Sequence, residues 1–570
     1  MKNSIKFFVL AAALLCAGSC HEPDELEPST SKQGINSISA QFATGEFKTD
    51  TQAKFTTMIT DPAQERIVIN IPYYYPEATT QTTEITQMRV TANLDDNCKI
   101  TPALGTLDLT KENWFTLTRA DGTKMKYCVT GQIKKSNKCA IEEFKLPALN
   151  LVGIINEDKH EISIVAVGAL APATAAYRLS YHASISPDPA AAEIDYNSDV
   201  VFTVTAHDGT STQKYTVKKT VPPKVPTGIR TGSQKLLWAK TLYANLGIST
   251  VNMTGGMAVT DKYILLNTRN ANSIVIDRQT GAKLREYDLP ASCKGGLVNF
   301  YNTADAAGNI LLCNLSPNAG SFKIWKIAAD LQSAPELWLE WAGKKAMGRK
   351  ISVCGSIDGN AIITAPIHTN GGQFARWQVV GGVLTNKTPD IITIAGTNAW
   401  SNNNVDIIYT DPTNVSSDYF AAYYGGGNII GRFNGQTNTL ISKVTDVISA
   451  NYVANSVDFV RFNNYDYMAF TSFNGFTWGG GGNPPSTDCC WMLDASGGVP
   501  FSGNPSAQPL CIMQSAEYRS RSVSNGGVAN GNTTGDIAFY SSPDGYMLYM
   551  YMMITNGHLV AWQFDCIDNE

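Results

Sequence analysis

The sequence repeats itself, and this repetition limits the folds that are open to it. The segment FTLTRADGTKMKYCV at residues 115–129 returns as FTVTAHDGTSTQKYTV at residues 202–217. In both copies, apolar residues alternate with polar ones on each side of Asp-Gly. This is the pattern of a β-hairpin whose turn needs a positive φ at glycine. Upstream, KITP at 99–102 matches SISP at 184–187, so we predict a duplicated module of short strands.

Duplicated modules made of short alternating strands are typical of immunoglobulin-like β-sandwiches. We predict two of them, at residues 34–132 and 133–220. The stretch VPPKVP follows the second copy, and a proline-rich run of this kind favours an extended linker, which we place at residues 221–234.

The remaining region, residues 235–570, contains a looser recurrence. Six segments combine apolar strands with turns, from GMAVTDKYILLN to GDIAFYSSPDGYMLYM. This recurrence predicts a β-propeller of six blades, and a large irregular sandwich is the alternative. The early strand KLLWAKTL at 235–242 is expected to complete the last sheet and close the ring. Charged residues make up only 16% of the chain, which fits an all-β protein poor in helix formers.

The N-terminus has the layout of a secretory signal. Lys2 and Lys6 precede a short apolar stretch that is too short to cross a bilayer, and small residues at 17–19 lead to Cys20. This resembles a bacterial lipobox, although Ala17 stands where the lipobox usually has leucine. We therefore predict a signal peptide at residues 1–19 and lipidation at Cys20, with an ordinary cleaved signal as the alternative. Residues 20–33 would form a lipidated acidic spacer.

The lipobox, the acidic leader and the F-T-[LV]-T-x-x-D-G-T modules together resemble a family of uncharacterised surface lipoproteins of gut Bacteroidetes. The resemblance implies immunoglobulin-like modules before a propeller-like region, and attachment to the outer membrane facing the cell exterior. It also implies a context of starch-utilisation-type glycan uptake, with a polysaccharide or oligosaccharide as ligand and an outer-membrane transporter complex as a further partner. The family brings no catalytic residues that could be transferred.

No motif for chemistry is convincing, so catalytic residues stay unidentified. His160-Glu161 lacks the second histidine of H-E-x-x-H, and G-x-S-x-G is absent. The cysteines have no zinc spacing, and the Asp-Gly pairs suit turns better than calcium loops, so we expect no metal and no cofactor. A disulfide among Cys98, Cys128 and Cys139 is left open. The net charge of -5, without a basic cluster, argues against nucleic acid.

Aromatic residues beside glycine and asparagine are the more informative feature, because the apolar face of a sugar ring stacks on an aromatic ring. We single out Trp400, Tyr423, Tyr424 and Trp478 as candidate glycan contacts, with packing between blades as the alternative for each. The leading hypothesis is noncatalytic glycan binding. The alternatives are a glycoside hydrolase or lyase with carboxylates at the propeller axis, and an envelope scaffold that binds protein.

Overall fold

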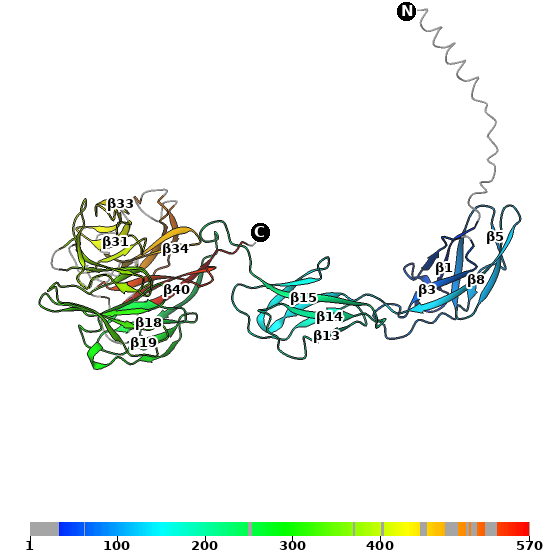
Figure 1. Cartoon of the computed structure of the whole chain (residues 1–570), viewed down its shortest axis with the longest axis horizontal. Coiled ribbons are helices and arrows are strands. Elements are labelled where there is room, and N and C mark those ends of the chain that lie inside the picture. Colours follow the sequence, from blue (N-terminus) through cyan, green and yellow to red (C-terminus); the bar gives the residue numbers. More distant parts are fainter. Residues whose placement is uncertain are drawn as a thin grey trace, which may run out of the picture. The chain divides into compact units, whose positions relative to one another are not determined.

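The computed structural model describes residues 34–61, 63–248, 253–368, 371–400, 404–444, 453–473, 488–497, 501–502, 510–518, 530 and 533–568. The signal peptide, Cys20 and the acidic spacer lie outside these ranges. The chain divides into two compact units, residues 1–221 and 222–570, and the described parts of both are built from strands (Figure 1). Among the described residues, no helix combines the length and apolar character that crossing a membrane requires.

Two four-stranded sheets form the first half of unit 1 around one hydrophobic core. The first sheet has the order β2-β1-β4-β6, with β1 (Ile35–Phe42), β2 (Phe55–Met58), β4 (Met88–Leu94) and β6 (Thr106–Leu107). The second has the order β3-β8-β7-β5, with β3 (Arg66–Pro72), β5 (Lys99–Thr101), β7 (Asn113–Thr118) and β8 (Lys124–Lys134). A 3-10 helix, η1 (Glu46–Thr49), follows β1. Along β3 every second residue is buried, so one face of the strand enters the core.

The second half of unit 1 is a single seven-stranded sheet with the order β12-β9-β10-β11-β15-β14-β13. Its strands are β9 (Ile141–Leu146), β10 (Leu151–Asn156), β11 (Glu161–Val165), β12 (Ala176–Leu179), β13 (Ser184–Ser186), β14 (Val200–Thr205) and β15 (Thr212–Thr220), with η2 (Pro147–Leu149) after β9. Residues of β9, β11, β14 and β15 join one core cluster, which requires the sheet to curl around its own inner face.

The duplicated hairpins predicted from the sequence are confirmed. Strands β7 and β8 pair antiparallel, and so do β14 and β15. In the two turns, Gly122 has φ +84° and Gly209 has φ +73°. Both hairpins also place their second strand parallel to an earlier strand, β8 beside β3 and β15 beside β11. The sequence repeat therefore corresponds to a repeat in strand pairing.

The described residues of unit 2 form six antiparallel sheets, and each follows the previous one along the chain. The first sheet consists of β17 (Thr254–Val259), β18 (Tyr263–Thr268), β19 (Ser273–Asp277) and β20 (Lys283–Tyr287). The second consists of β21 (Tyr301–Ala304), β22 (Ile310–Cys313), β23 (Phe322–Ile327) and β24 (Glu336–Trp341). The third consists of β25 (Ser352–Gly355), β26 (Ala361–Pro366), β27 (Gln373–Val380), β28 (Val383–Leu384) and β29 (Asp390–Thr393). A 3-10 helix, η3 (Ala291–Cys293), lies between the first and second sheets.

The last of the other three sheets takes in one strand from the start of the unit. The fourth sheet consists of β30 (Asp406–Tyr409), β31 (Tyr419–Tyr424), β32 (Asn428–Phe433) and β33 (Leu440–Val444), and the fifth of β34 (Val453–Phe462), β35 (Tyr465–Phe473), β36 (Cys489–Asp494) and β37 (Cys511–Gln514). The sixth consists of β38 (Gly535–Ser541), β39 (Met547–Ile554), β40 (His558–Asp565) and β16 (Lys235–Thr241). Strand β16 pairs with β40, so KLLWAKTL completes the last sheet as predicted.

The first strands of the six sheets form a closed circle. Strand β17 contacts β21, and contacts continue from β21 to β25, β30, β34 and β38 and back to β17. We call these six the inner strands. Hydrophobic clusters fill the spaces between neighbouring sheets. Trp325, Trp377 and Trp562 are buried.

Part of the predicted linker is bonded to the end of unit 2. The backbone N–H of Val225 donates to the carbonyl of Cys566, and Arg230 pairs with Asp565.

All ten cysteines within the described ranges are free, so the disulfide left open by the sequence is not formed.

Candidate functional site

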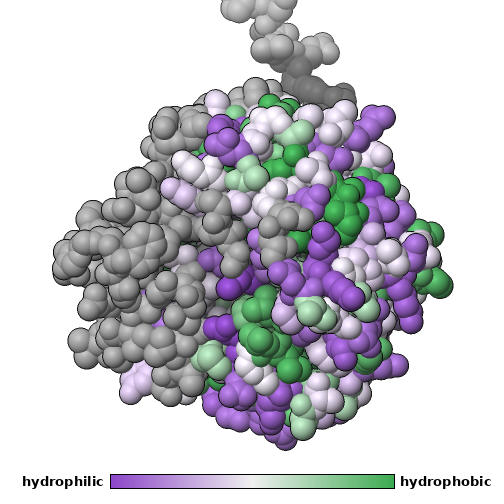
Figure 2. All heavy atoms as spheres, turned by 90° about the vertical axis from the view of Figure 1, so that its left-hand side faces the viewer, coloured by the Kyte–Doolittle hydropathy of each residue, from purple (hydrophilic) through white to green (hydrophobic). Residues whose placement is uncertain are grey.

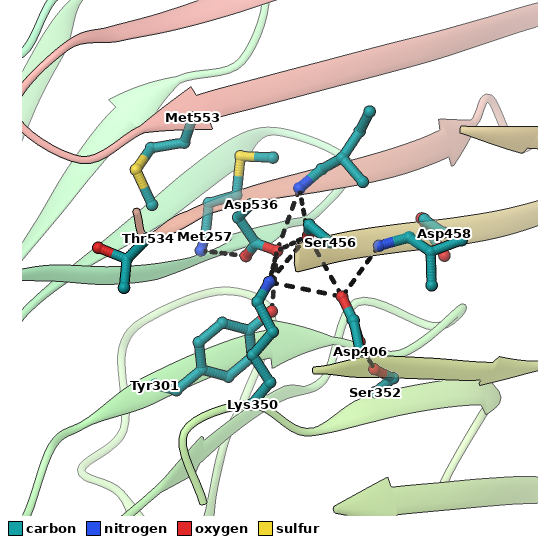
Figure 3. Close-up of polar contacts among 12 residues, drawn as sticks. Met257, Tyr301, Lys350, Ser352, Asp406, Ser456, Asp458, Thr534, Asp536 and Met553 are labelled. Carbon is teal, nitrogen blue, oxygen red and sulfur yellow. Dashed lines mark hydrogen bonds and ion pairs between the residues drawn. The ribbon is translucent and has the colours of Figure 1, made fainter. Parts of the chain in front are cut away.

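Charged side chains from distant parts of the sequence meet inside the circle of inner strands (Figure 3). Asp406 is the first residue of β30, Asp536 is the second residue of β38, and Lys350 lies just before β25. The Nζ of Lys350 lies 3.4 Å from Asp406 Oδ2 and 3.1 Å from Asp536 Oδ1. One ammonium group therefore joins carboxylates that belong to two different sheets.

Hydroxyl groups complete the same network. Ser456 of β34 places its Oγ 2.8 Å from Lys350 Nζ, 3.2 Å from Asp406 Oδ2 and 3.0 Å from Asp536 Oδ1. The Tyr301 hydroxyl donates to Asp536 Oδ1 at 2.9 Å, and the Ser352 hydroxyl donates to Asp406. We call these six residues the axial cluster: Tyr301, Lys350, Ser352, Asp406, Ser456 and Asp536.

Backbone donors use the remaining acceptor positions of the two carboxylates. The N–H of Met257 donates to Asp536 Oδ2 at 2.9 Å, and the N–H of Val457 donates to Asp406 Oδ2 at 3.2 Å. All three charged side chains are almost completely buried, with exposed fractions of 3% to 6%. Burial raises the pKa of Asp536, and the positive charge of Lys350 opposes that rise. A buried charge is tolerated only when it is paired and hydrogen-bonded, and both conditions are met here.

A cavity of about 460 Å³ opens beside the axial cluster. Its wall includes the last residues of inner strands, among them Val259, Ala304, Gly355, Tyr409 and Ser541. These residues place the cavity, which we call the axial cavity, at the C-terminal ends of the inner strands. Cavities that hold small molecules fall in the range of about 300–1,000 Å³, so this volume suits a small ligand.

Asp458 adds a titratable group to this cavity. It lies two residues after Ser456 on β34, so the two side chains leave the same face of the strand. Its carboxylate accepts hydrogen bonds from the N–H groups of Phe459 at 2.8 Å and Phe539 at 2.6 Å. Burial outweighs these bonds and raises the pKa of Asp458 to about 7. A carboxyl group that titrates near neutrality can donate or accept a proton, so Asp458 is a candidate acid or base.

The predicted glycan contacts lie elsewhere. Trp400 is 5% exposed and donates its indole N–H to the carbonyl of Ile367, while Tyr423 is 0% exposed and donates its hydroxyl to the carbonyl of Asn398. Their rings pack edge to face with centroids 5.5 Å apart. The structure thus brings these two residues together, but as core residues without an open face for a sugar, which fits packing, the stated alternative, rather than glycan contact.

The other two candidates give no further support. Tyr424 is half-buried at the end of β31, and Trp478 lies outside the described residues, as does the predicted lipidation site Cys20. Within the ranges that the structure describes, no group of three or more histidine, cysteine or acidic side chains is placed to hold a metal ion.

Sequence reasoning missed the axial cluster, although a signal is present. A single aspartate occurs in a short, otherwise apolar stretch of an inner strand three times, in VDIIY at 405–409, VDFV at 457–460 and GDIAF at 535–539. A charged residue is rarely placed in a buried strand without a partner. This recurrence could have pointed to Asp406, Asp458 and Asp536, but the sequence alone offers no reason to choose Lys350 as the partner.

The fold and the site define an all-β protein whose second unit encloses a buried ionic cluster and a ligand-sized cavity. The chain belongs to the family described as a domain of unknown function (DUF8500), whose model matches residues 239–567. Residues 15–131 and 141–219 match two other families, each also described as a domain of unknown function (DUF5018 and DUF8499). No curated protein matches the sequence.

Solved structures from Bacteroides species are similar to this chain at low sequence identity. A DUF4623 family protein from Bacteroides eggerthii is 15% identical with a TM-score of 0.45, and the match covers 75% of this chain and 98% of that one. A protein of unknown function from Bacteroides caccae is 14% identical with a TM-score of 0.28, and the match covers 46% of this chain and 85% of that one.

Proposed function

We propose that this chain is a surface lipoprotein that binds glycans without cleaving them. In this proposal, Cys20 carries the lipid that anchors the chain to the outer membrane, facing the cell exterior. Unit 1 then acts as a spacer of two immunoglobulin-like modules, and unit 2 is the binding head. The bound polysaccharide or oligosaccharide would be passed to an outer-membrane transporter complex.

The finer description of the fold belongs to the same proposal. Six consecutive antiparallel sheets, a closed circle of first strands and a last sheet completed by β16 are the features that favour a six-bladed propeller. Two sheets around one core, followed by a repeat of the same hairpin, favour immunoglobulin-like modules in unit 1. A propeller has an axial channel, which is where the cavity of unit 2 lies.

The axial cavity is the observation that carries the proposal. It is lined by the partly exposed rings of Phe459 and Tyr540 together with polar groups such as Thr410 and Arg461. A saccharide needs both kinds of surface, because its C–H faces pack on aromatic rings while its hydroxyl groups need hydrogen-bond partners. The cavity therefore offers the mixture of contacts that a sugar unit requires.

The axial cluster supports binding without catalysis. Glycoside hydrolysis usually needs one carboxyl group to protonate the leaving oxygen and a second that acts as nucleophile or base. Asp406 and Asp536 are both paired with Lys350, and their oxygens already accept hydrogen bonds from serine, tyrosine and backbone donors. Carboxylates held in this way serve the fold rather than a reaction.

The surface of unit 2 gives less support to a protein-binding scaffold. Figure 2 shows one end of this unit, and on its described part hydrophobic residues are scattered among hydrophilic ones. A surface that binds another protein through apolar contacts would show a larger continuous patch. On this face, the mixture of residues favours a polar ligand.

The test incubates residues 21–570 with an array of plant, mucin and microbial glycans and measures retained binding and released reducing ends in the same wells. Ala306 lines the axial cavity, whereas its neighbour Ala307 does not, and both are exposed. Ala306→Trp should abolish binding by filling the mouth of the cavity, and Ala307→Trp should bind as the unmodified chain does. Equal binding by both variants would show that the cavity is not the glycan site.

Asp458 provides the observation for a second candidate function, a glycoside hydrolase. A pKa of about 7 would allow this carboxyl group to act as a general acid at neutral pH. In that case the array would show released sugar, and Asp458→Asn would stop the release while binding is retained. Release that survives Asp458→Asn would exclude this residue as the acid, and binding without release would leave the noncatalytic function standing.

A further inference from the structure

Two arginines lie at the opposite end of the inner strands from the axial cavity. Arg269 directly follows β18, and Arg349 precedes Lys350 in the segment that leads into β25. Their guanidinium carbons lie 4.6 Å and 5.9 Å from the centre of the Phe300 ring. Both arginines therefore approach the same aromatic ring, which lies just before β21.

A second, much smaller cavity marks this end. It measures about 20 Å³ and is lined by both arginines, Phe300 and Lys350, together with residues at the starts of inner strands such as Thr254 and Gly535. The axial cavity is lined by residues at the ends of those strands, such as Val259 and Ser541. The two cavities therefore lie on opposite sides of the axial cluster.

Neither arginine has a partner of opposite charge among the described residues. No ion pair or hydrogen bond joins either guanidinium to a carboxylate, and the Nε atoms of both are buried without a hydrogen-bond partner. Two other partly buried arginines of unit 2 have such a partner, because Arg376 pairs with Asp390 and Arg432 with Asp418. A buried cation without an anion is costly, so an unpaired arginine pair points to a missing partner.

The surroundings add positive rather than negative charge. Burial and the nearby charge of Arg349 lower the pKa of Arg269, and burial together with Arg349 lowers the pKa of His368 to about 3. The two carboxylates of the axial cluster, Asp406 and Asp536, are occupied by Lys350. The described side chains at this end therefore leave the two guanidinium charges unbalanced.

We propose that Arg269 and Arg349 form an anion-binding site, which takes the carboxylate or sulfate group of a larger molecule. A cavity of this size holds about one or two oxygen atoms and no sugar ring, so the anionic group would enter while the rest of the ligand stays outside. A planar guanidinium donates two parallel hydrogen bonds to such a group. The Thr254 hydroxyl, which is buried without a partner, is a further donor beside the cavity.

This site goes beyond the proposed glycan site and does not depend on it. The ligand chemistry is an oxyanion, which could come from a free inorganic anion or from an acidic saccharide. A uronic acid carries a carboxylate and a sulfated sugar carries a sulfate ester, so both fit the same two arginines. The affinities of the two kinds of anion distinguish these sources.

The test titrates residues 21–570 in low-salt buffer with four probes: sodium sulfate, galacturonate, chondroitin sulfate and, as the neutral control, galactose. We expect saturable binding of the anionic probes and none of galactose. Arg269→Gln and Arg349→Gln should each weaken anion binding by about tenfold to a hundredfold, because each removes charge-assisted hydrogen bonds. Arg432→Gln, whose arginine already has a carboxylate partner, should bind the anions as the unmodified chain does.

A stability measurement separates loss of the site from loss of the fold. Without added anion, removing one of two repelling cations should leave the midpoint of thermal unfolding unchanged or raise it. Sulfate at concentrations that saturate the site should raise the midpoint of the unmodified chain by more than that of Arg349→Gln. A lowered midpoint of Arg349→Gln without anion, together with unchanged anion binding by the folded variant, would overturn the proposal.

The remaining outcomes identify the source of the anion. If chondroitin sulfate and galacturonate bind more tightly than sodium sulfate, the result supports an acidic saccharide as the ligand. Equal affinities would support a free anion. No saturable binding of any anion would refute the site. Ala306→Trp should leave anion binding intact, because Ala306 lies at the other end of the inner strands. Failure of the glycan proposal can therefore be told apart from failure of this one.

Discussion

Replacing Lys350 with methionine should destabilise unit 2 strongly. The methionine side chain matches the lysine stem in length but removes the ammonium group that joins Asp406 to Asp536. Both carboxylates would then remain buried, at 4% and 3% exposure, without a compensating charge. Breaking a buried ion pair by removing one partner costs about 3–5 kcal/mol of stability. This range includes the hydrogen bond between the Lys350 ammonium group and Ser456, which is lost at the same time.

The cost should depend on pH in a definite direction. In the folded variant, the pKa of Asp536 lies above the unfolded value of about 4, because burial raises it and the opposing charge of Lys350 is gone. The folded state then binds more protons than the unfolded state in the interval between these two pKa values. The stability of Lys350→Met should therefore fall as pH rises, so its deficit is larger at about pH 8 than at about pH 5.

The assay is equilibrium unfolding of residues 21–570 in urea, followed by tryptophan fluorescence at both pH values. Lys326→Met is the matched control, because Lys326 pairs with Asp358 at the surface, with exposed fractions of 29% and 58%. A surface pair contributes about 0–1 kcal/mol. Adding Asp536→Asn to Lys350→Met should recover part of the loss, because one of the two unpaired charges is then removed.

A deficit below about 1 kcal/mol for Lys350→Met, equal to that of Lys326→Met, would refute the reasoning. It would show that the axial cluster is hydrated or rearranged in solution and that Lys350 does not hold the inner strands together. A large deficit that Asp536→Asn does not relieve would point instead to lost packing around the lysine stem.

Substitutions and reagents at single positions test three further points. The pKa of Asp458 in the folded state is about 7, above the unfolded value, so this carboxyl group should lower the stability of the unmodified chain as pH rises from about 4 to 7. Asp458→Asn should remove that decrease, and urea midpoints across this pH range measure it. Gly348→Ala should lower the urea midpoint, since φ is +99° there and a Cβ would overlap the backbone oxygen of Asn314. The thiol of Cys313, whose pKa is raised by burial, should stay unreactive toward a disulfide reagent until the chain unfolds, and rapid labelling would contradict its burial.

Local patterns allowed much of the fold to be predicted from the sequence. The hairpin at residues 115–129 is specified by alternation and by a glycine that adopts positive φ, both of which are properties of neighbouring residues. The pairing of KLLWAKTL with β40 followed from the need of a ring of sheets to close.

The site could not be predicted in the same way, because its members are joined only by tertiary structure. Lys350 and Asp536 are separated by 186 positions, and no local pattern marks either as the partner of the other. The burial of two aromatic candidates could not be predicted for a related reason. Trp400 stands beside polar residues in the sequence, yet its ring packs against Tyr423 of β31, and such packing is invisible to composition.

The pairing of β16 with β40 has a consequence for the stability of unit 2. Lys235 stands opposite Gln563, so β16 gains its partner only from residues that lie far later in the sequence. A variant without β38 to β40 would leave the backbone edge of β16 unpaired and would lack the carboxylate of Asp536 beside Lys350. The pairing of β16 and the ion pair of Lys350 with Asp536 therefore depend on the same sheet, and loss of that sheet would remove both at once.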